Sequence, residues 1–308
     1  MDAISELREN ILAIYARFEM YITPIAKFIL ALISIIMINS GLGFSDKASK
    51  LIIVIVISLI AAFLPVNCII VVDALFILLH LYSLSIQVVA VVGLVFVIMF
   101  VLYFRFTPKE AIAVVLTPIF FALKIPYVVP LVVGFVGSPI SFVSVCCGTV
   151  VYYIIKGIGG NPDIYNGSLS VESALSGFKS VIDNVLNNKT MILMVIVCAL
   201  VVVLTNVIKR LSFDFSWQVA LAVSSISGLI VIIIGSGVLD ADVSIVGAII
   251  SMLISAILVF ILQLFIHNLD YSRAEYVQFQ DEEFFYYVKA IPRYGVDTER
   301  RDTRRGGR

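Results

Sequence analysis

Long apolar runs separated by short polar connections make up most of this chain. A helix needs roughly 20 apolar residues, at 1.5 Å each, to cross about 30 Å of hydrocarbon. Eight runs are close enough to this requirement to predict membrane spans: Tyr21–Leu42, Leu51–Val66, Asn67–Ile86, Val88–Phe104, Tyr127–Ile155, Met191–Ile208, Gln218–Val238 and Val243–His267. The pattern therefore predicts an all-α integral membrane protein with about eight transmembrane helices.

A ninth apolar run, Ala111–Leu123, is shorter and contains Pro118. Basic residues near span ends favour the cytoplasmic side. If this run returns to the side it entered from and the N-terminus is inside, 16 of the 21 lysines and arginines lie inside; if it crosses, only 8 do. The basic C-terminal tail alone makes that difference. We therefore expect a short re-entrant or broken helix here, and N- and C-termini in the cytoplasm.

The polar parts of the chain have their own patterns. Residues 1–20 place apolar side chains at alternating spacings of three and four, which predicts an amphipathic helix in the membrane interface. Residues 21–155 form the first part of the membrane domain, with a broken segment at 111–139, and residues 191–267 form the second. The extracytoplasmic loop 156–190 contains one apolar helix face over 171–186, typical of a lid or a gate at the outer mouth.

The cytoplasmic tail, residues 268–308, contains two short stretches rich in aromatic and β-branched residues. Tyr276–Phe279 and Phe284–Ile291 flank the acidic Gln280–Glu283, which predicts a small β-hairpin with a four-residue loop. A lone hairpin is marginal in water, so we expect it to pack on the membrane domain or pair with a partner. From Asp297 onward the composition is typical of disorder.

Composition agrees with the pattern and excludes several functions. Hydrophobic residues make up 61% of the 308 and charged residues 14%, well below the roughly 25% charged residues of a soluble domain. The one basic cluster, residues 300–308, lies in the polar tail, so no nucleic-acid partner is expected. No phosphate-binding glycine loop, zinc-binding histidine pair or nucleophile elbow is present. We expect no enzyme activity, no cofactor and no metal.

Polar side chains recur within the third predicted span. Asp73, His80, Ser83 and Gln87, spaced by seven, three and four residues, would share one helix face over about 20 Å of depth. A charge at mid-bilayer costs several kcal/mol unless it is paired, neutralised or facing water. The face could therefore be a polar path for protons or a small cation, or it could bind neighbouring helices together.

A second candidate site is the stretch Thr117–Pro139. Proline lacks the backbone donor, so we expect the helix to break within this stretch, whose prolines and glycines are Pro118, Pro126, Pro130, Gly134, Gly137 and Pro139. Broken backbone at membrane depth must be buried in protein or line a wet cavity, and transporters bind ions there. Lys124 could neutralise Asp73, attract an anion, or extend to the headgroups.

Two stretches of the chain echo one another. Phe44-Ser-Asp-Lys47 and Phe106-Thr-Pro-Lys109 each precede an apolar run, and Pro65 and Pro126 close those runs. Near-equal offsets favour a duplication, which is common in transporter folds, although apolar sequences also resemble one another by chance. The echo conflicts with a topology in which the first run crosses and the second does not.

The tail Glu275–Pro292, EYVQFQDEEFFYYVKAIP, follows a series of apolar spans. In this it resembles uncharacterised multi-pass membrane proteins of clostridial-type bacteria that are sometimes labelled permease-like. The resemblance implies a bacterial plasma membrane and membership of a transport complex, with an ATPase subunit or another cytoplasmic protein as partner of the tail. It implies no ligand residue. The leading hypothesis is a permease-like subunit or small transporter; the alternative is a scaffold that anchors a partner through the hairpin.

Overall fold

The computed structural model describes residues 2–160, 162, 187–211, 215–266, 275–280 and 285–290. The chain divides into two compact units, Thr23–Val259 and a smaller one made of Met1–Ile22 with Phe260–Arg308. Each is described by itself. The predicted loop helix at 171–186 and the polar end after Asp297 lie outside the described residues.

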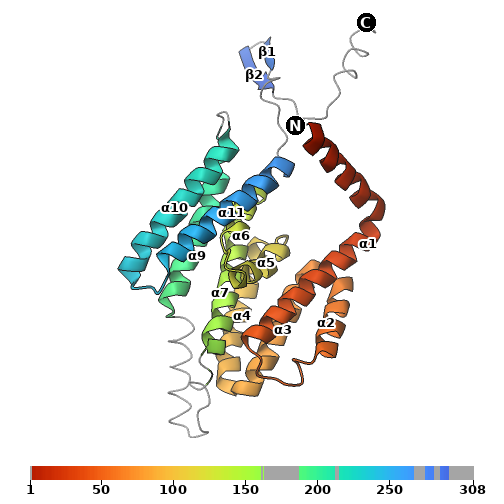
Figure 1. Cartoon of the computed structure of the whole chain (residues 1–308), viewed down its shortest axis with the longest axis vertical. Helices are drawn as coiled ribbons and strands as arrows, with labels where there is room; N and C mark the ends of the chain where they lie inside the picture. The colour runs from red at the N-terminus through yellow and green to blue at the C-terminus, as the bar shows by residue number, and fades with distance from the viewer. Residues whose placement is uncertain are drawn as a thin grey trace. The chain divides into compact units, whose positions relative to one another are not determined.

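Helices form nearly all of the described structure (Figure 1). They are α1 (Asp2–Gly41), α2 (Leu51–Phe63), α3 (Val66–Leu84), α4 (Ile86–Phe106), α5 (Ala111–Ala122), α6 (Val128–Val136), the 3₁₀ helix η1 (Pro139–Ser141), α7 (Phe142–Gly160), α9 (Lys189–Ile208), α10 (Ser216–Leu239) and α11 (Ile245–Ile266). α1 and α11 begin or end in the smaller unit, which also contains β1 (Glu275–Gln280) and β2 (Phe285–Ala290).

Seven helices in the described part of the chain are long and apolar enough to cross a membrane. They are the α1 segment Ala13–Gly41, α3, α4, the stretch Pro139–Gly160, α9, α10 and the α11 segment Ile245–Gln263. Large apolar side chains are exposed on these helices, Leu75 at 61% and Val101 at 65% among them. Since only lipid tolerates such a surface, the helices indicate a multi-pass membrane protein.

Two of the predicted spans differ from the structure. Tyr127–Ile155 was expected as one span and is wrong as such, because the chain leaves the helix at Gly137 and Ser138 between α6 and η1. α2 ends at Phe63, before Pro65, and its 13 residues reach about 20 Å, short of the hydrocarbon thickness. The predicted count of eight spans is therefore not reproduced.

The short helices α2 and α5 bear on the internal echo. Both follow one of the two echoed motifs, and they have nearly the same length, 13 and 12 residues. Each comes after a long helix, α1 or α4, and before a helix that starts just past Pro65 or Pro126. The conflict seen in the sequence, where one run was expected to cross and the other to re-enter, is thereby removed.

The N-terminal helix is longer than expected. The predicted interfacial helix of residues 1–20 and the first span are both part of α1, which bends where Phe18 takes non-helical dihedral angles, φ −116° and ψ 17°. Because Ile14 and Phe18 are about half exposed, this stretch keeps apolar surface available to an interface.

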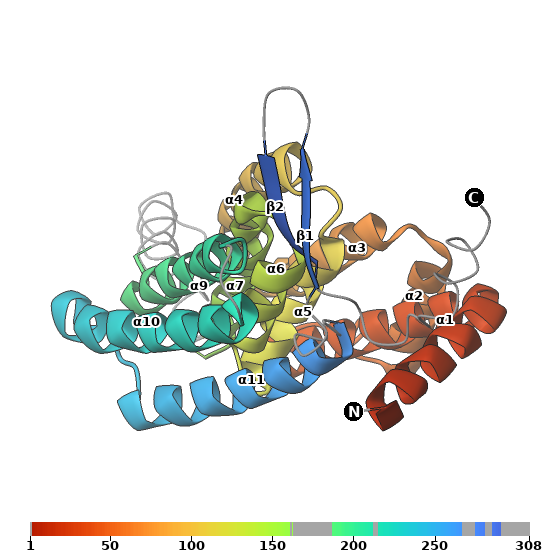
Figure 2. The same ribbon diagram turned by 90° about the horizontal axis from the view of Figure 1, so that it is seen from above.

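Close helix crossings hold the larger unit together, and glycines permit them. At Gly159 on α7 a Cβ atom would overlap the carbonyl oxygen of Gly41 on α1, and at Gly148 it would lie 2.7 Å from the carbonyl oxygen of Val114 on α5. α9 and α10 run side by side (Figures 1 and 2), with Gly228 of α10 against Val201. Gly228 thus permits the close packing of α10 on α9.

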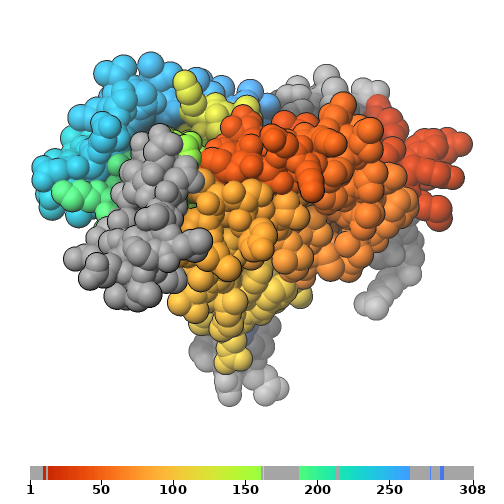
Figure 3. Space-filling model, turned by 90° about the horizontal axis from the view of Figure 1, so that it is seen from below, coloured from red at the N-terminus to blue at the C-terminus, as the bar shows by residue number. Residues whose placement is uncertain are grey.

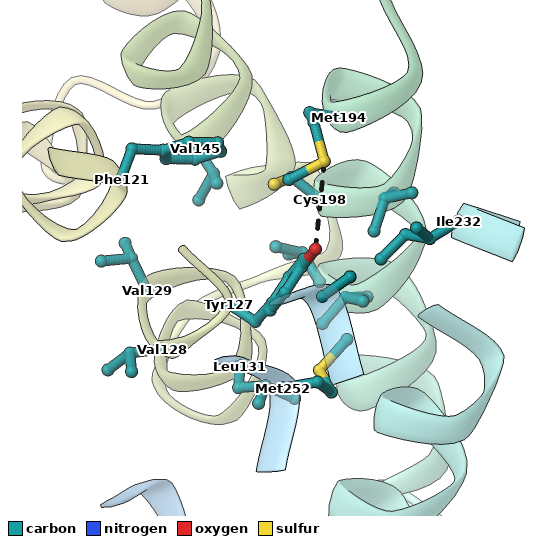
Figure 4. Packing of buried hydrophobic residues seen from close by; sticks show 14 of the residues in the cluster. Phe121, Tyr127, Val128, Val129, Leu131, Val145, Met194, Cys198, Ile232 and Met252 are labelled. Carbon is teal, nitrogen blue, oxygen red and sulfur yellow. Dashed lines mark hydrogen bonds between the residues drawn. The ribbon is translucent and has the colours of Figure 1, made fainter. Parts of the chain in front are cut away.

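The largest buried cluster joins α5, α6, α7, α9, α10 and α11. Figure 4 shows Tyr127, at the start of α6, pointing to α9, where its hydroxyl donates to the Sδ of Met194 at 4.0 Å. The ring is 1% exposed, so its hydroxyl needs a partner in the core. This cluster fixes the short α6 against the longer helices.

In the smaller unit, β1 and β2 pair antiparallel, with Gln280 opposite Phe285 and Glu275 opposite Ala290. Their positions correspond to the two aromatic stretches of the tail. On β2, Phe285 and Tyr287 are 66% and 78% exposed. Since alternate residues of a strand share a face, these two rings form one exposed aromatic face.

Candidate functional site

Asp73 lies near the middle of α3, within an apolar surround. Its Oδ1 accepts a hydrogen bond of 2.9 Å from the hydroxyl of Ser34 on α1. The same hydroxyl lies 3.0 Å from the carbonyl oxygen of Ala31 and has one hydrogen for two acceptors. Among the described residues no lysine, arginine or histidine pairs with this carboxyl.

A small cavity of about 40 Å³ adjoins Asp73. α1, α3, α4, α5 and α7 form its walls, and most lining side chains are apolar, among them Met37, Phe96 and Pro118. The space exceeds the roughly 10–15 Å³ that one water needs, but few polar groups reach it. Pro118, predicted in the broken segment, thus lies beside Asp73, and the two candidate regions meet at this cavity.

His80 lies two turns further along α3 but does not line the cavity. Its Nδ1 accepts a 3.3 Å hydrogen bond from the backbone N–H of Ser45, in the connection from α1 to α2. Its ring meets Phe76 edge-on at 4.9 Å, and its buried Nε2 has no partner among the described residues. In this arrangement His80 anchors a loop rather than extending a path from Asp73.

Two members of the predicted face are placed differently. α3 ends at Leu84, and Ser85 begins α4 by accepting the N–H of Gln87 at 3.3 Å. Gln87 therefore belongs to α4, and the expectation that it shares the third helix is wrong. Ser83 remains on α3 but is exposed. Of the predicted face, His80 is fully buried and Asp73 is partly buried.

Lys124 does not meet Asp73. It lies in the turn after α5 with a left-handed φ of +62°, and its side chain is exposed. The N–H of Lys124 bonds to Phe121 and that of Ile125 to Phe120, the hydrogen-bond pattern of a Schellman helix end. Its backbone position is therefore structural, and the hypothesis that it neutralises Asp73 finds no ion pair in the part described.

The break after α6 is stabilised by residues that the sequence did not single out. Lys209, just past α9, directs its Nζ to the carbonyl oxygens of Gly134, Phe135 and Gly137 at 2.9, 2.6 and 3.3 Å. Asn206 donates to Gly134 and Gly137 at 3.1 and 2.7 Å. The last carbonyls of a helix lack partners within it and carry negative charge, so an ammonium and an amide satisfy them.

Glu110 binds the helices that follow the break, as Lys209 and Asn206 bind the helix that precedes it. Its carboxylate accepts hydrogen bonds from the hydroxyls of Ser141 and Ser144, the latter at 2.8 Å. Ser141 is the last residue of η1 and Ser144 lies in the first turn of α7, and Ser141 also accepts the N–H of Ser138. An anion near a helix N-terminus and a cation near a C-terminus are both favourable. Charged and amide side chains of the protein itself thus satisfy the polar groups on both sides of the break.

Lys209 also titrates unusually. Burial, with a smaller contribution from the neighbouring Arg210, lowers the pKa of the Lys209 ammonium to about 8. This residue lies just outside the candidate span Lys189–Ile208. A substantial neutral fraction is therefore expected at mildly alkaline pH, and the neutral amine still donates hydrogen bonds.

Sequence reasoning missed Ser34, Glu110, Asn206 and Lys209. Lys209 counted only as a basic residue at a span end, and Ser34 is one small polar residue in a long apolar run. Within the described ranges no cluster of three or more His, Cys, Asp or Glu side chains could hold a metal. Comparison with family models, curated proteins and solved structures finds no match, so the geometry alone supports a functional proposal.

Proposed function

We propose that this chain is a transport-related membrane protein in which Asp73 binds a proton within the bilayer. One observation carries the proposal: a mid-span carboxyl borders a small, mainly apolar cavity and has only a serine hydroxyl as partner in the described residues. A lone carboxylate there costs several kcal/mol, and taking up a proton removes that cost. Intramembrane carboxyls of this kind mark proton and ion pathways.

The hydrogen bonding of Ser34 supports a reversible proton site. When Asp73 is ionised, the single hydroxyl hydrogen of Ser34 serves the carboxylate. When Asp73 is protonated, the carboxyl donates to Ser34, which is then free to donate to the carbonyl of Ala31, 3.0 Å away. Both protonation states thus have a satisfied arrangement without backbone movement. Protons fit the small cavity better than a hydrated cation does.

Carbodiimide labelling tests the proton site directly. Dicyclohexylcarbodiimide adds the O–H of a protonated, lipid-accessible carboxyl across its C=N bond, and peptide mass spectrometry locates the adduct. We expect label on Asp73 that decreases as pH rises, none at that position in Asp73→Asn, and unchanged label on Asp73 in Asp46→Asn, a matched change in an exposed loop. Absence of label on Asp73 in the wild-type protein at every pH would overturn the proposal.

Proton movement is tested in liposomes that contain a pH-sensitive dye, with a potassium diffusion potential across the membrane. Wild-type protein should acidify or alkalinise the lumen according to the sign of the potential, and Asp73→Asn should match empty liposomes. Label without flux would refute transport and leave a proton-binding carboxyl. The location we propose is the one that the basic residues and the resemblance of the tail imply. It is a bacterial plasma membrane, with both chain ends in the cytoplasm.

A second candidate function is a scaffold, favoured by the exposed face of Phe285 and Tyr287 on β2. Such a strand can pair with an extended segment of a cytoplasmic partner, including an ATPase subunit. Two variants distinguish these hypotheses by their effect on activity in cells. Under the scaffold hypothesis Asp73→Asn is silent in cells and deletion of residues 275–292 removes activity; under the transport hypothesis Asp73→Asn removes it.

A further inference from the structure

A second, larger hollow lies in the same unit, away from Asp73. It is an open cleft of about 590 Å³ between α1, α5 and α7. Its floor and walls are mainly apolar, with Ile33 and Ile36 from α1, Ile119 and Leu123 from α5, and Ile155 from α7. The volume falls within the roughly 300–1,000 Å³ of typical ligand sites.

The cleft has one polar end. Ser40 and Gly41 close α1, and Lys156 and Gly160 lie in the last turns of α7; all four border the cleft. The two helix ends lie next to each other in the view from below (Figure 3), held by the Gly159–Gly41 contact. From this end to Ile33 is eight residues of helix, about 12 Å. The cleft therefore runs from a cationic mouth into an apolar interior.

We propose that this cleft binds an anionic phospholipid, with an acyl chain along the apolar wall and the phosphate at Lys156. The Lys156 ammonium is exposed and lies 5.9 Å from the ring centroid of Tyr152, with no carboxylate partner among the described residues. Basic pockets between membrane helices recognise anionic headgroups. Water is a poor occupant because the walls offer it few polar groups.

Small residues at its border also help to keep the cleft open. Ala122 and Gly160 border the cleft with little or no side chain, and a Cβ atom at Gly160 would have no neighbour within 4 Å. The walls belong to the candidate spans α1 and α7 and to the short apolar helix α5. Lipid can therefore reach the cleft. This inference is independent of Asp73.

Photo-crosslinking with phosphatidylglycerol that carries a diazirine in its acyl chain tests the site. Protein in neutral detergent should be labelled on α1 near Ile33–Ser40 and on α5 near Ile119–Leu123. Unlabelled phosphatidylglycerol should compete about fivefold better than phosphatidylcholine of the same chains, the preference expected from one lysine. Lys156→Ala should remove this preference and Lys156→Arg should retain it.

Two further variants keep the test decisive. Ala122→Phe should block the cleft and remove the label while the melting temperature stays near that of the wild type, since Ala122 is exposed. Lys50→Ala, an exposed lysine in the connection before α2, should change nothing. Label spread evenly over the apolar surface, or an unchanged headgroup preference in Lys156→Ala, would overturn the proposal.

Discussion

Two polar places in the larger unit, Asp73 and the break after α6, differ in how far the chain satisfies them. Five hydrogen bonds from Lys209 and Asn206 close the end of α6, and Glu110 binds the serines that start the next helices. Asp73 has one hydroxyl. Transporters often use broken helices to bind ions, but here the break is occupied by the protein itself.

The difference separates structure from function. A group whose partners are all supplied by the chain contributes to stability, and changing it should unfold the protein before it alters any activity. A buried group with too few partners is costly to keep and marks a functional site. We therefore expect stability to depend on the break and activity to depend on Asp73.

The largest effect is expected for Lys209→Met, which removes the ammonium from three carbonyl oxygens at the end of α6. A buried acceptor left without its donor costs roughly 1–3 kcal/mol, and Lys209 is a donor to three carbonyl oxygens. We expect the free energy of unfolding to decrease by roughly 2–4 kcal/mol, and denaturant titration in detergent measures this change.

Lys189→Met is the matched control for Lys209→Met. Lys189 pairs with Asp240 at 3.8 Å on the surface, with both side chains largely exposed, and such pairs contribute about 0–1 kcal/mol. Equal losses in the two variants would show that the break is not held by Lys209, and the contrast with Asp73 would fail.

A smaller loss is expected for Gly159→Ala, which forces α1 and α7 apart at Gly41. Overpacking of this kind costs roughly 1–3 kcal/mol. The change should also disturb Asp73, because α1 carries Ser34, while leaving the break intact. Gly160→Ala, one residue on, meets open space and should keep wild-type stability. Thermal unfolding of the two variants, alongside carbodiimide labelling of Asp73, separates the two regions.

The sequence predicted the parts of this picture that depend on neighbouring residues. Proline and glycine predicted a break in Thr117–Pro139, and the helix does end near Pro126 and at Gly137, but Pro118 lies inside α5 and Pro130 and Gly134 lie inside α6. Apolar runs located α3 and α4 to within two residues. The assignment of Gln87 failed because two apolar helices meet at the single residue Ser85, which interrupts hydropathy very little. Hydropathy alone also joined Tyr127–Ile155 into one span, because this run of 29 residues contains no charge.

Partners from distant parts of the chain could not be predicted in this way. Lys209 meets Gly134 across 75 residues, and Glu110 meets Ser144 across 34. No periodicity links such positions, since they are brought together by the packing of α6, α7 and α9. Asp73 was found because a carboxyl in an apolar run is conspicuous by itself, but its partner Ser34 was not.

Stability should also change with pH through Lys209. Its pKa falls from 10.5 to about 8 on folding, so between these values the unfolded chain binds more protons than the folded chain. Unfolding then takes up a proton, and stability rises as pH increases from about 8 towards 10.5. The wild-type protein should show this rise in detergent. The variant should lack it; an identical pH profile would contradict the titration.

The smallest effect concerns access to Asp73 and leaves the break untouched. Met37 lines both the cavity at Asp73 and the larger cleft, so its side chain stands between them. Met37→Ala should join the two spaces and raise the rate of carbodiimide labelling of Asp73 severalfold. Met99→Ala, which enlarges the cavity at Asp73 from α4 without reaching the cleft, should leave the rate near that of the wild type. Both variants lose the same atoms, so a difference between them reports the opening rather than general loosening. Equal rates would mean that carbodiimide reaches Asp73 by another route, even if Asp73 itself still binds the proton.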